Sequence, residues 1–325
     1  MTTPQQPIDS GFGAATTSDD VLQGRDLSGR QAIVTGGYDG IGLETALKLA
    51  KAGAQVIVPA RTLRKAHAAL DGIANVTIEP LDLLNPASID AFAAKFVETG
   101  KPLHILINNA GIMANPLTRD VRGYESQFAT NHLGHFHLVA RLWPALKRAN
   151  GARVVAISSR GHRRAGVDFD DPNFEQRNYE RWVAYGQSKS ANVLFAVGLD
   201  AKAMQHGVRA FALHPGAIIT NLAQYITKED IRASGVLDEN DQYIYDPVKA
   251  LKTLEQGAAT SLWCATSPTL DGMGGVYCED CNIAQAVPAD STGLTGVRLW
   301  AIDRTLAQRL WALSERLTGV RATLD

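Results

Sequence analysis

Tyr185 and Lys189 stand four residues apart in the sequence Ala184-Tyr-Gly-Gln-Ser-Lys-Ser190. In a helix this spacing places two side chains on one face, one turn apart. An ammonium group beside a phenol favours the phenolate, so we expect Lys189 to lower the pKa of Tyr185 from about 10 towards neutrality. The tyrosine could then move a proton as a general acid/base. Such a pair is by itself usually a surface contact, so a catalytic role for it depends on other motifs in the chain.

Three glycines connect a short apolar run to a helical pattern near the start of the chain. The run Gln31-Ala-Ile-Val-Thr35 is typical of a buried strand, and apolar residues at helical spacing begin at Ile41. Gly36, Gly40 and Gly42 allow a tight turn and a close approach of the backbone to a ligand. A strand that enters a helix through such a turn offers free N–H groups and a positive dipole end to a pyrophosphate. Glycine spacing alone also fits an ordinary turn, but a second strand pattern follows and completes a βαβ unit.

Six motifs occur in an order that resembles the short-chain dehydrogenase/reductase family, over about residues 27 to 285. They are Thr35-Gly36-x-x-x-Gly40-x-Gly42, Asn108-Asn-Ala-Gly111, Asn131 within a helical pattern, Ser158-Ser159 at a strand end, Tyr185-x-x-x-Lys189 and His214-Pro-Gly216. The insert from Arg160 to Trp182 and the sequence Lys189-Ser-Ala-Asn-Val-Leu-Phe195 are similar to the retinol dehydrogenase-like branch of that family. A strand-end serine would otherwise be read as a turn residue.

The resemblance implies a role for each catalytic residue. Tyr185 would be the general acid/base, and Ser159, with Ser158 as the fallback, would hold the substrate oxygen. Lys189 would tune Tyr185 and bond the nicotinamide ribose, and the backbone of Asn131 would hold a relay water. Tyr179 has Val183, not lysine, four residues later, so it is not a candidate.

The resemblance also implies a dinucleotide contact set, in which Asp82 would lie beside the adenine ring. A turn or a helix start is the other interpretation of Asp82. Ala110 and Gly111 are small, which suits a place where a flat ring lies on the backbone. The expected contacts are Gly36, Tyr38, Gly40, Ile41, Gly42, Arg61, Asp82, Asn109, Ala110, Gly111, Tyr185, Lys189, Pro215, Gly216, Ile218 and Thr220.

Arg61 follows the second strand, where dinucleotide folds distinguish the adenosine ribose. An acidic residue there binds a free 2′-hydroxyl, whereas arginine suits a 2′-phosphate. Arg64 and Lys65 add positive charge, although a solvated arginine at a helix start is the simpler alternative. Asp39 in the glycine turn would repel a phosphate unless it turns outward or pairs with Arg61. We therefore expect NADP as the cofactor, with NAD possible.

The alternation of strand and helix patterns from Leu27 onward predicts an α/β fold, a single Rossmann-type doubly wound parallel sheet with helices on both faces. We expect a flexible N-terminal arm over 1–27, a dinucleotide-binding catalytic domain over 28–287 and a C-terminal helical extension over 288–325. A helix is predicted from Asp303 to Gly319, and a substrate loop near 222–250, which Tyr243 and Tyr245 would line. The expected strands are 31–35, 55–59, 75–80, 103–108, 152–158, 208–213 and 275–278.

Composition narrows the class of protein. The chain has 325 residues, of which 45% are hydrophobic, and a net charge of −1, so nucleic acid and anionic membranes are not expected partners. No run of about 20 apolar residues suggests a membrane span, and no signal peptide pattern opens the chain. A soluble, cytoplasmic enzyme is the simplest class, and the family resemblance implies a possible homo-oligomer, a dimer or tetramer.

Neither the histidines nor the cysteines predict a metal site. His132 and His135 share a helix face with no acidic or cysteine partner at a suitable spacing, so packing roles are favoured for them and for His137. The Cys278-x-x-Cys281 pair has one other cysteine in the chain, too few for a four-cysteine zinc site. A redox pair is a weaker interpretation than buried, inert thiols.

The expected function is an NAD(P)-dependent oxidoreductase that transfers a hydride between nicotinamide and a small carbonyl or alcohol substrate. Two alternatives remain. Protochlorophyllide reductases, which reduce a C=C double bond, share these motifs. A non-catalytic dinucleotide-sensing scaffold would need only the glycine turn, and retention of the four catalytic residues argues against it. The substrate cannot be read from the sequence because loops of this kind constrain shape poorly.

Overall fold

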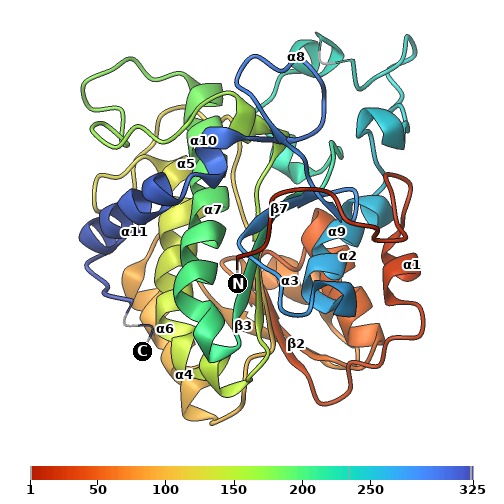
Figure 1. The fold of residues 1–325 in the computed structure, drawn as a ribbon, viewed down its shortest axis with the longest axis vertical. Coiled ribbons are helices and arrows are strands. Elements are labelled where there is room, and N and C mark those ends of the chain that lie inside the picture. Colours follow the sequence, from red (N-terminus) through yellow and green to blue (C-terminus); the bar gives the residue numbers. More distant parts are fainter. Residues whose placement is uncertain (1, 234, 323, 325) are drawn as a thin grey trace.

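The computed structural model describes residues 2–233, 235–322 and 324 (Figure 1). A twisted sheet runs through the middle of the molecule, between two layers of helices. The expected strands are confirmed to within one or two residues. The strands of the sheet are β1 Gln31–Val34, β2 Gln55–Ala60, β3 Val76–Pro80, β4 Ile105–Asn108, β5 Arg153–Ile157, β6 Arg209–His214, β7 Val276–Glu279 and β8 Asn282–Ile283.

Helices cover both faces of the sheet, and Figure 1 shows α4, α6, α7 and α11 on one side and α2, α3 and α9 on the other. Each layer is held by an apolar cluster shared with the strands. The helices are α1 Ser18–Leu22, α2 Gly40–Lys51, α3 Leu63–Leu70, α4 Pro86–Glu98, α5 Ser126–Phe128, α6 Gly134–Arg148, α7 Arg181–Ala203, α8 Lys228–Ala233, α9 Leu254–Thr266, α10 Leu299–Ile302 and α11 Arg304–Thr318.

The strand order is β3-β2-β1-β4-β5-β6-β7-β8, and every pair is parallel except β7 with β8. The chain winds outward from β1 to β3, then returns to place β4 on the other side of β1. This reversal is the switch point at which open parallel sheets bind ligands, beyond the carboxyl ends of the strands. The predicted doubly wound parallel sheet is therefore confirmed. In the described residues, no helix combines the length and the apolar character that a membrane crossing requires.

The N-terminal arm contacts the body of the protein through hydrogen bonds and buried side chains. The Gln5 side-chain amide donates to the backbone carbonyl of Tyr277 and accepts from its N–H, both at 2.8 Å. The Asn282 side chain likewise bonds the backbone of Ile8 in both directions. The arm thus supplies a partner for the Tyr277 N–H and shares the Tyr277 carbonyl oxygen with the Ala284 N–H. Val21 in α1 is buried in the layer that contains α9.

The C-terminal extension returns to the body of the protein. A short parallel pair, β9 Ala286–Val287 and β10 Val297–Arg298, leads into α10 and α11. Asp303 caps the first turn of α11 and Gly319 ends the helix in the left-handed conformation, as the predicted helix required. Trp311 stacks on Phe195 of α7 with the ring centroids 6.1 Å apart. The helix thus shields α7, which carries Tyr185 and Lys189.

Candidate active site

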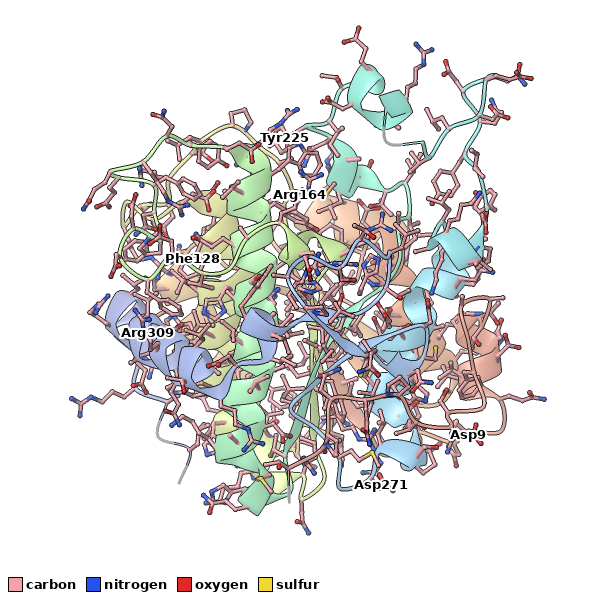
Figure 2. The ribbon with its side chains drawn as sticks, turned by 45° about the horizontal axis from the view of Figure 1, so that its top comes forward. Asp9, Phe128, Arg164, Tyr225, Asp271 and Arg309 are labelled. Carbon is pink, nitrogen blue, oxygen red and sulfur yellow. The ribbon has the colours of Figure 1, made fainter. Side chains whose placement is uncertain are left out.

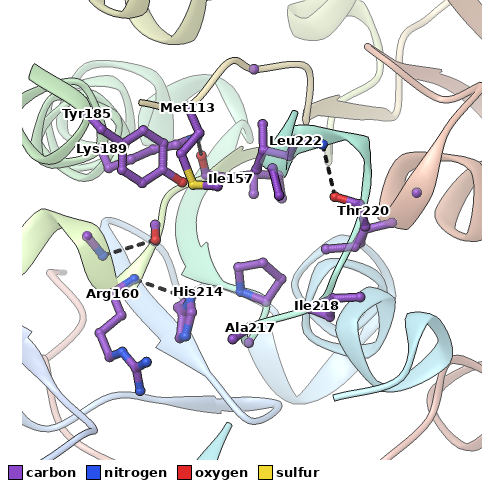
Figure 3. Close-up of a pocket in the computed structure, with 18 of the residues that line it drawn as sticks. Met113, Ile157, Arg160, Tyr185, Lys189, His214, Ala217, Ile218, Thr220 and Leu222 are labelled. Carbon is purple, nitrogen blue, oxygen red and sulfur yellow. Dashed lines mark hydrogen bonds between the residues drawn. The ribbon is translucent and has the colours of Figure 1, made fainter. Parts of the chain in front are cut away.

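A cleft of about 1050 Å³ opens beyond the carboxyl ends of the strands, at the switch point of the sheet. Figure 3 shows Tyr185, Lys189 and Met113 on one side of this cleft and Ala217, Ile218 and Thr220 on another. Every expected cofactor residue except Asp82 lines it, and so do Ser159, Tyr185 and Lys189. The cleft therefore brings together motifs that are up to 184 positions apart, from Gly36 to Thr220.

The glycine turn between β1 and α2 leaves a cradle that a β-carbon would fill. Gly36 and Gly40 both have positive φ angles, +64° and +51°. A β-carbon on Gly42 would lie 2.3 Å from Asn109 Nδ2 and 2.4 Å from the Gly36 carbonyl oxygen. Helix α2 begins here, and its N-cap residue, Asp39, makes no side-chain capping bond. The first N–H groups of the helix are therefore available to an anion such as a pyrophosphate, so the turn fits a dinucleotide.

Replacing Gly42 by alanine should remove cofactor binding, because the new methyl group would collide with backbone atoms of the turn. We expect a loss of stability of about 1–3 kcal/mol, the usual cost of overpacking. Thermal unfolding with and without NADP would measure both effects. Gly198→Ala in α7 is the matched control, since its β-carbon would make ordinary contacts at 3.4 Å or more. A Gly42→Ala protein that binds NADP normally would contradict this account of the turn.

The two serines at the end of β5 face different ways. Ser158 is buried and its hydroxyl donates to the Lys189 carbonyl oxygen at 2.7 Å, so it is occupied in fixing α7. The Ser159 hydroxyl accepts a bond from the Gly161 N–H at 3.0 Å and keeps its own proton for a further acceptor. Gly161 packs against the Tyr185 ring, where a β-carbon would come within 2.8 Å of Cε1. Ser159 is thus the serine placed beside the tyrosine.

The Tyr185–Lys189 pair does not have the expected electrostatics. The Lys189 ammonium nitrogen lies 5.6 Å from the centre of the Tyr185 ring and donates to the Ile157 carbonyl oxygen at 3.0 Å. Burial raises the pKa of Tyr185 to about 12, although hydrogen bonding to Ser159 opposes the rise. Burial also lowers the pKa of Lys189 to about 8. The direction is therefore opposite to the expected lowering of the tyrosine pKa, because the loss of hydration outweighs the hydrogen bond to Ser159.

Asn131 lies behind the cleft and does not line it. Its Oδ1 accepts from the Ile112 N–H at 2.9 Å, and its Nδ2 donates to the Ile112 carbonyl oxygen and to Ser188. These bonds fix the loop that follows Gly111. The residue lies in a π-helical turn, Ala129–Leu133, of the kind often found at functional sites. A β-carbon on Gly111 would lie 3.0 Å from Asn131 Oδ1 and 3.6 Å from Lys189 Nζ, so the asparagine and the lysine both approach this glycine.

Asp82 is the other expected residue that lies outside the cleft. Its carboxylate accepts the Leu84 N–H at 3.0 Å, and its own N–H donates to Ser88 Oγ at 2.9 Å. These contacts are those of a turn that precedes a helix. Asp82 is thus hydrogen-bonded as a turn residue and is not among the residues that line the cleft.

The charged residues expected to decide between NADP and NAD do not all line the cleft. Arg61 and Lys65 line the cleft, whereas Arg64 does not. Asp39 accepts a hydrogen bond from Asn221 Nδ2 at 2.7 Å, across the mouth of the cleft. In the described part of the chain Arg61 forms no ion pair with it or with any other carboxylate.

Comparison with known proteins agrees with this geometry. Residues 30–231 match the family model described as short chain dehydrogenase. This chain belongs to the short-chain dehydrogenase/reductase family. It is 46% identical to a probable oxidoreductase from Streptomyces antibioticus, over 88% of this chain and 96% of the relative. It is 37% identical to human retinol dehydrogenase 12, over 88% of each chain, which supports the retinol dehydrogenase-like branch.

A solved structure of the same family contains a cofactor. The RhlG/NADP active-site complex of Pseudomonas aeruginosa superposes with a TM-score of 0.61, is 26% identical, and covers 78% of this chain and 94% of that one. Members of the family use an NAD(P) nucleotide, so this dehydrogenase/reductase is an oxidoreductase with a nicotinamide cofactor.

Several residues of this dehydrogenase's cleft were not found from the sequence. Arg160, Arg163 and Arg164, in the insert, line its substrate end together with Arg298 and residues 291–293 of the C-terminal extension. The basic run directly after Ser159 was a usable signal. No sequence signal indicates that residues 291–293 line the cleft, because nothing in the sequence links that segment to Ser159.

Of the two tyrosines expected to line the substrate loop near 222–250, one lines the cleft. Tyr243 lines the cleft, and its ring centre lies 4.8 Å from that of Tyr245, which does not line it.

The three cysteines are free and buried. His132 is hydrogen-bonded to Ser314, His135 to Thr35 and Asn131, and His137 to Asp90. Across the described residues, no three His, Cys, Asp or Glu side chains are grouped as metal ligands.

Proposed function

We propose that this enzyme transfers a hydride between NADP and a carbonyl or alcohol substrate. The observation that carries the proposal is the meeting of three groups in the cleft beside the glycine turn: the Tyr185 phenol, the Ser159 hydroxyl and the Lys189 ammonium. A bound nicotinamide would supply or accept the hydride. The protein would then have to bind the substrate oxygen and to move one proton.

The raised pKa of Tyr185 keeps its phenol protonated at neutral pH. At neutral pH a phenol whose pKa is about 12 is protonated, so it can give its proton to the oxygen of a carbonyl that is being reduced. Ser159 donates a second hydrogen bond to the same oxygen and stabilises its developing charge. Lys189, charged below pH 8, stabilises the phenolate that remains. In alcohol oxidation the same groups act in reverse.

A screen of aldehydes, ketones and alcohols, followed by nicotinamide absorbance, tests the proposal. Turnover of any of them supports carbonyl/alcohol chemistry and excludes a scaffold that only senses the dinucleotide. A conjugated enone separates the remaining alternative, since reduction of its C=C bond gives a saturated ketone and reduction of its carbonyl gives an allylic alcohol. Exclusive formation of the saturated ketone would favour the C=C reductase.

We expect NADP to be preferred over NAD, because Arg61 lines the cleft without an ion pair to any described carboxylate and Asp39 is held by Asn221. A hydrogen bond between the guanidinium and the 2′-phosphate should contribute about ten- to a hundredfold in affinity. The ratio of kcat/KM for the two cofactors should therefore fall by that factor in Arg61→Ala. Arg64→Ala is the matched control, since this residue lies three positions away and outside the cleft. A preference for NAD that does not change when Arg61 is removed would overturn the assignment.

A further inference from the structure

Four arginines line the substrate end of the cleft, and within the described residues none of them forms an ion pair with a carboxylate. Arg160, Arg163 and Arg164 come from the insert that follows Ser159, and Arg298 comes from β10. Among the ion pairs of the described residues, none includes any of these four arginines. Asp230, the acidic residue that lines this end of the cleft, pairs instead with Arg181 at 2.8 Å.

Two of the four arginines have neutral partners. The Arg163 guanidinium donates to the carbonyl oxygens of Ser291, Gly293 and Thr295. Arg298 donates to the carbonyl oxygens of Pro288 and Ser291, and its Nε has no partner although the residue is only 7% exposed. Carbonyl oxygens satisfy hydrogen bonds without cancelling charge. These two arginines therefore fasten the segment 288–298 over the cleft and leave its wall positive.

The carboxyl group of Glu279, which lies near Arg163, does not remove this charge. Glu279 accepts the Gly296 N–H at 2.7 Å and attracts Arg163. Burial raises the pKa of Glu279 to about 7, so near neutral pH a large part of it is uncharged.

The other two arginines keep their donors free for a ligand. No hydrogen bond from the Arg160 or Arg164 guanidinium to another described residue exists in the structure. Arg164 lies over the Trp182 ring at 5.3 Å, and the Trp182 ring centre lies 6.3 Å from that of Tyr185. Figure 2 shows Arg164 near the start of α7, whereas Arg309 lies apart from it on α11. One aromatic ring thus separates Arg164 from the proposed proton donor.

We propose that the substrate end of this cleft binds an anionic group, a carboxylate or a phosphate, carried by the substrate at a distance from its reacting carbonyl. Arg160 and Arg164 donate to the anion, and guanidinium groups match the planar, two-oxygen geometry of such groups. Arg163 and Arg298 add positive potential and hold the wall. The inference rests on the proposed oxidoreductase function and names its substrate class. The expected site of the cofactor phosphate is separate, since Arg61 and Lys65 follow β2 whereas Arg160 and Arg164 follow β5, on the other side of β1 in the sheet.

Matched substrates test the inference at saturating NADPH. Straight-chain oxo acids of increasing length would be compared with their methyl esters, and oxoalkyl phosphates with the corresponding oxo alcohols. We expect kcat/KM to favour the anion by about ten- to a hundredfold at the best chain length, and the ratio to collapse in Arg164→Gln and in the double variant with Arg160→Gln. The two series distinguish a carboxylate from a phosphate. Arg309→Gln is the control, since Arg309 also lies over an aromatic ring, that of Phe169 at 4.4 Å, but outside the cleft.

A binding measurement separates failure of this inference from failure of the proposed function. Calorimetry on the NADP-bound enzyme would compare an alkyl carboxylate and an alkyl phosphate with the matching amide and alcohol, which requires no turnover. Stronger binding of the anions in wild type, lost in Arg164→Gln but kept in Arg309→Gln, supports the anion site even if no carbonyl is turned over. Equal binding of anions and neutral analogues, or an anion preference that survives loss of both arginines, overturns it.

Discussion

Tyr185→Phe should lower kcat by a factor of about 10²–10⁴, the usual contribution of one general acid/base. The substitution removes only the hydroxyl, and the phenyl ring can keep its packing against Gly161 and its edge contact with Trp182. Cofactor affinity should therefore survive. The measurement is single-turnover reduction with an active carbonyl substrate, together with the Kd for NADPH.

Tyr179→Phe provides the control for that experiment. The Tyr179 hydroxyl donates to the Asn115 carbonyl oxygen at 2.9 Å and accepts from Gln127, outside the cleft. We expect Tyr179→Phe to cost about 0.5–1.5 kcal/mol of stability, the value of an ordinary hydrogen bond, with little change in kcat. If the Tyr179 change abolished turnover and the Tyr185 change were mild, the assignment of the proton donor would be wrong.

Lys189→Met should slow reduction about 10- to 100-fold and also weaken cofactor binding, because the change removes a buried charge next to the phenol but keeps the length of the side chain. The pH dependence identifies the cause. With the pKa of Lys189 lowered to about 8, the cation is present below pH 8 and is lost as the pH rises through that value. Wild-type kcat/KM for reduction should therefore fall above about pH 8, while Tyr185 stays protonated until about pH 12. The methionine variant should show no step near pH 8.

An exposed lysine serves as the control for the pH experiment. Lys202 lies on the same helix and contacts the Trp311 ring at 5.3 Å. Lys202→Met should leave both the rate and the alkaline step unchanged. A step near pH 8 that persists in Lys189→Met would assign it to another group and would leave Lys189 as a cofactor ligand only.

The sequence by itself determined the sheet and the motif-bearing positions. Strand patterns such as 31–35 and 152–158 were predicted within one or two residues, because buried strands and amphipathic helices have distinct periods. The glycine turn and the Tyr185–Lys189 pair on one helix face could also be predicted from the sequence, since both depend on local geometry within one or two turns of backbone. Family membership followed from the order of these motifs.

Only the tertiary structure decided the electrostatics of the site and the wall of its substrate end. The sequence predicts that Lys189 lowers the pKa of Tyr185, but burial in the folded protein raises it to about 12. The sequence offers Asp82 as a cofactor contact, yet Asp82 does not line the cleft, and one of its carboxylate oxygens accepts the Leu84 N–H. Residues 291–293 are held at the cleft because Arg163 and Arg298 both donate to the Ser291 carbonyl oxygen. Burial and long-range contacts of this kind are sums over the whole fold, so no local pattern in the sequence encodes them.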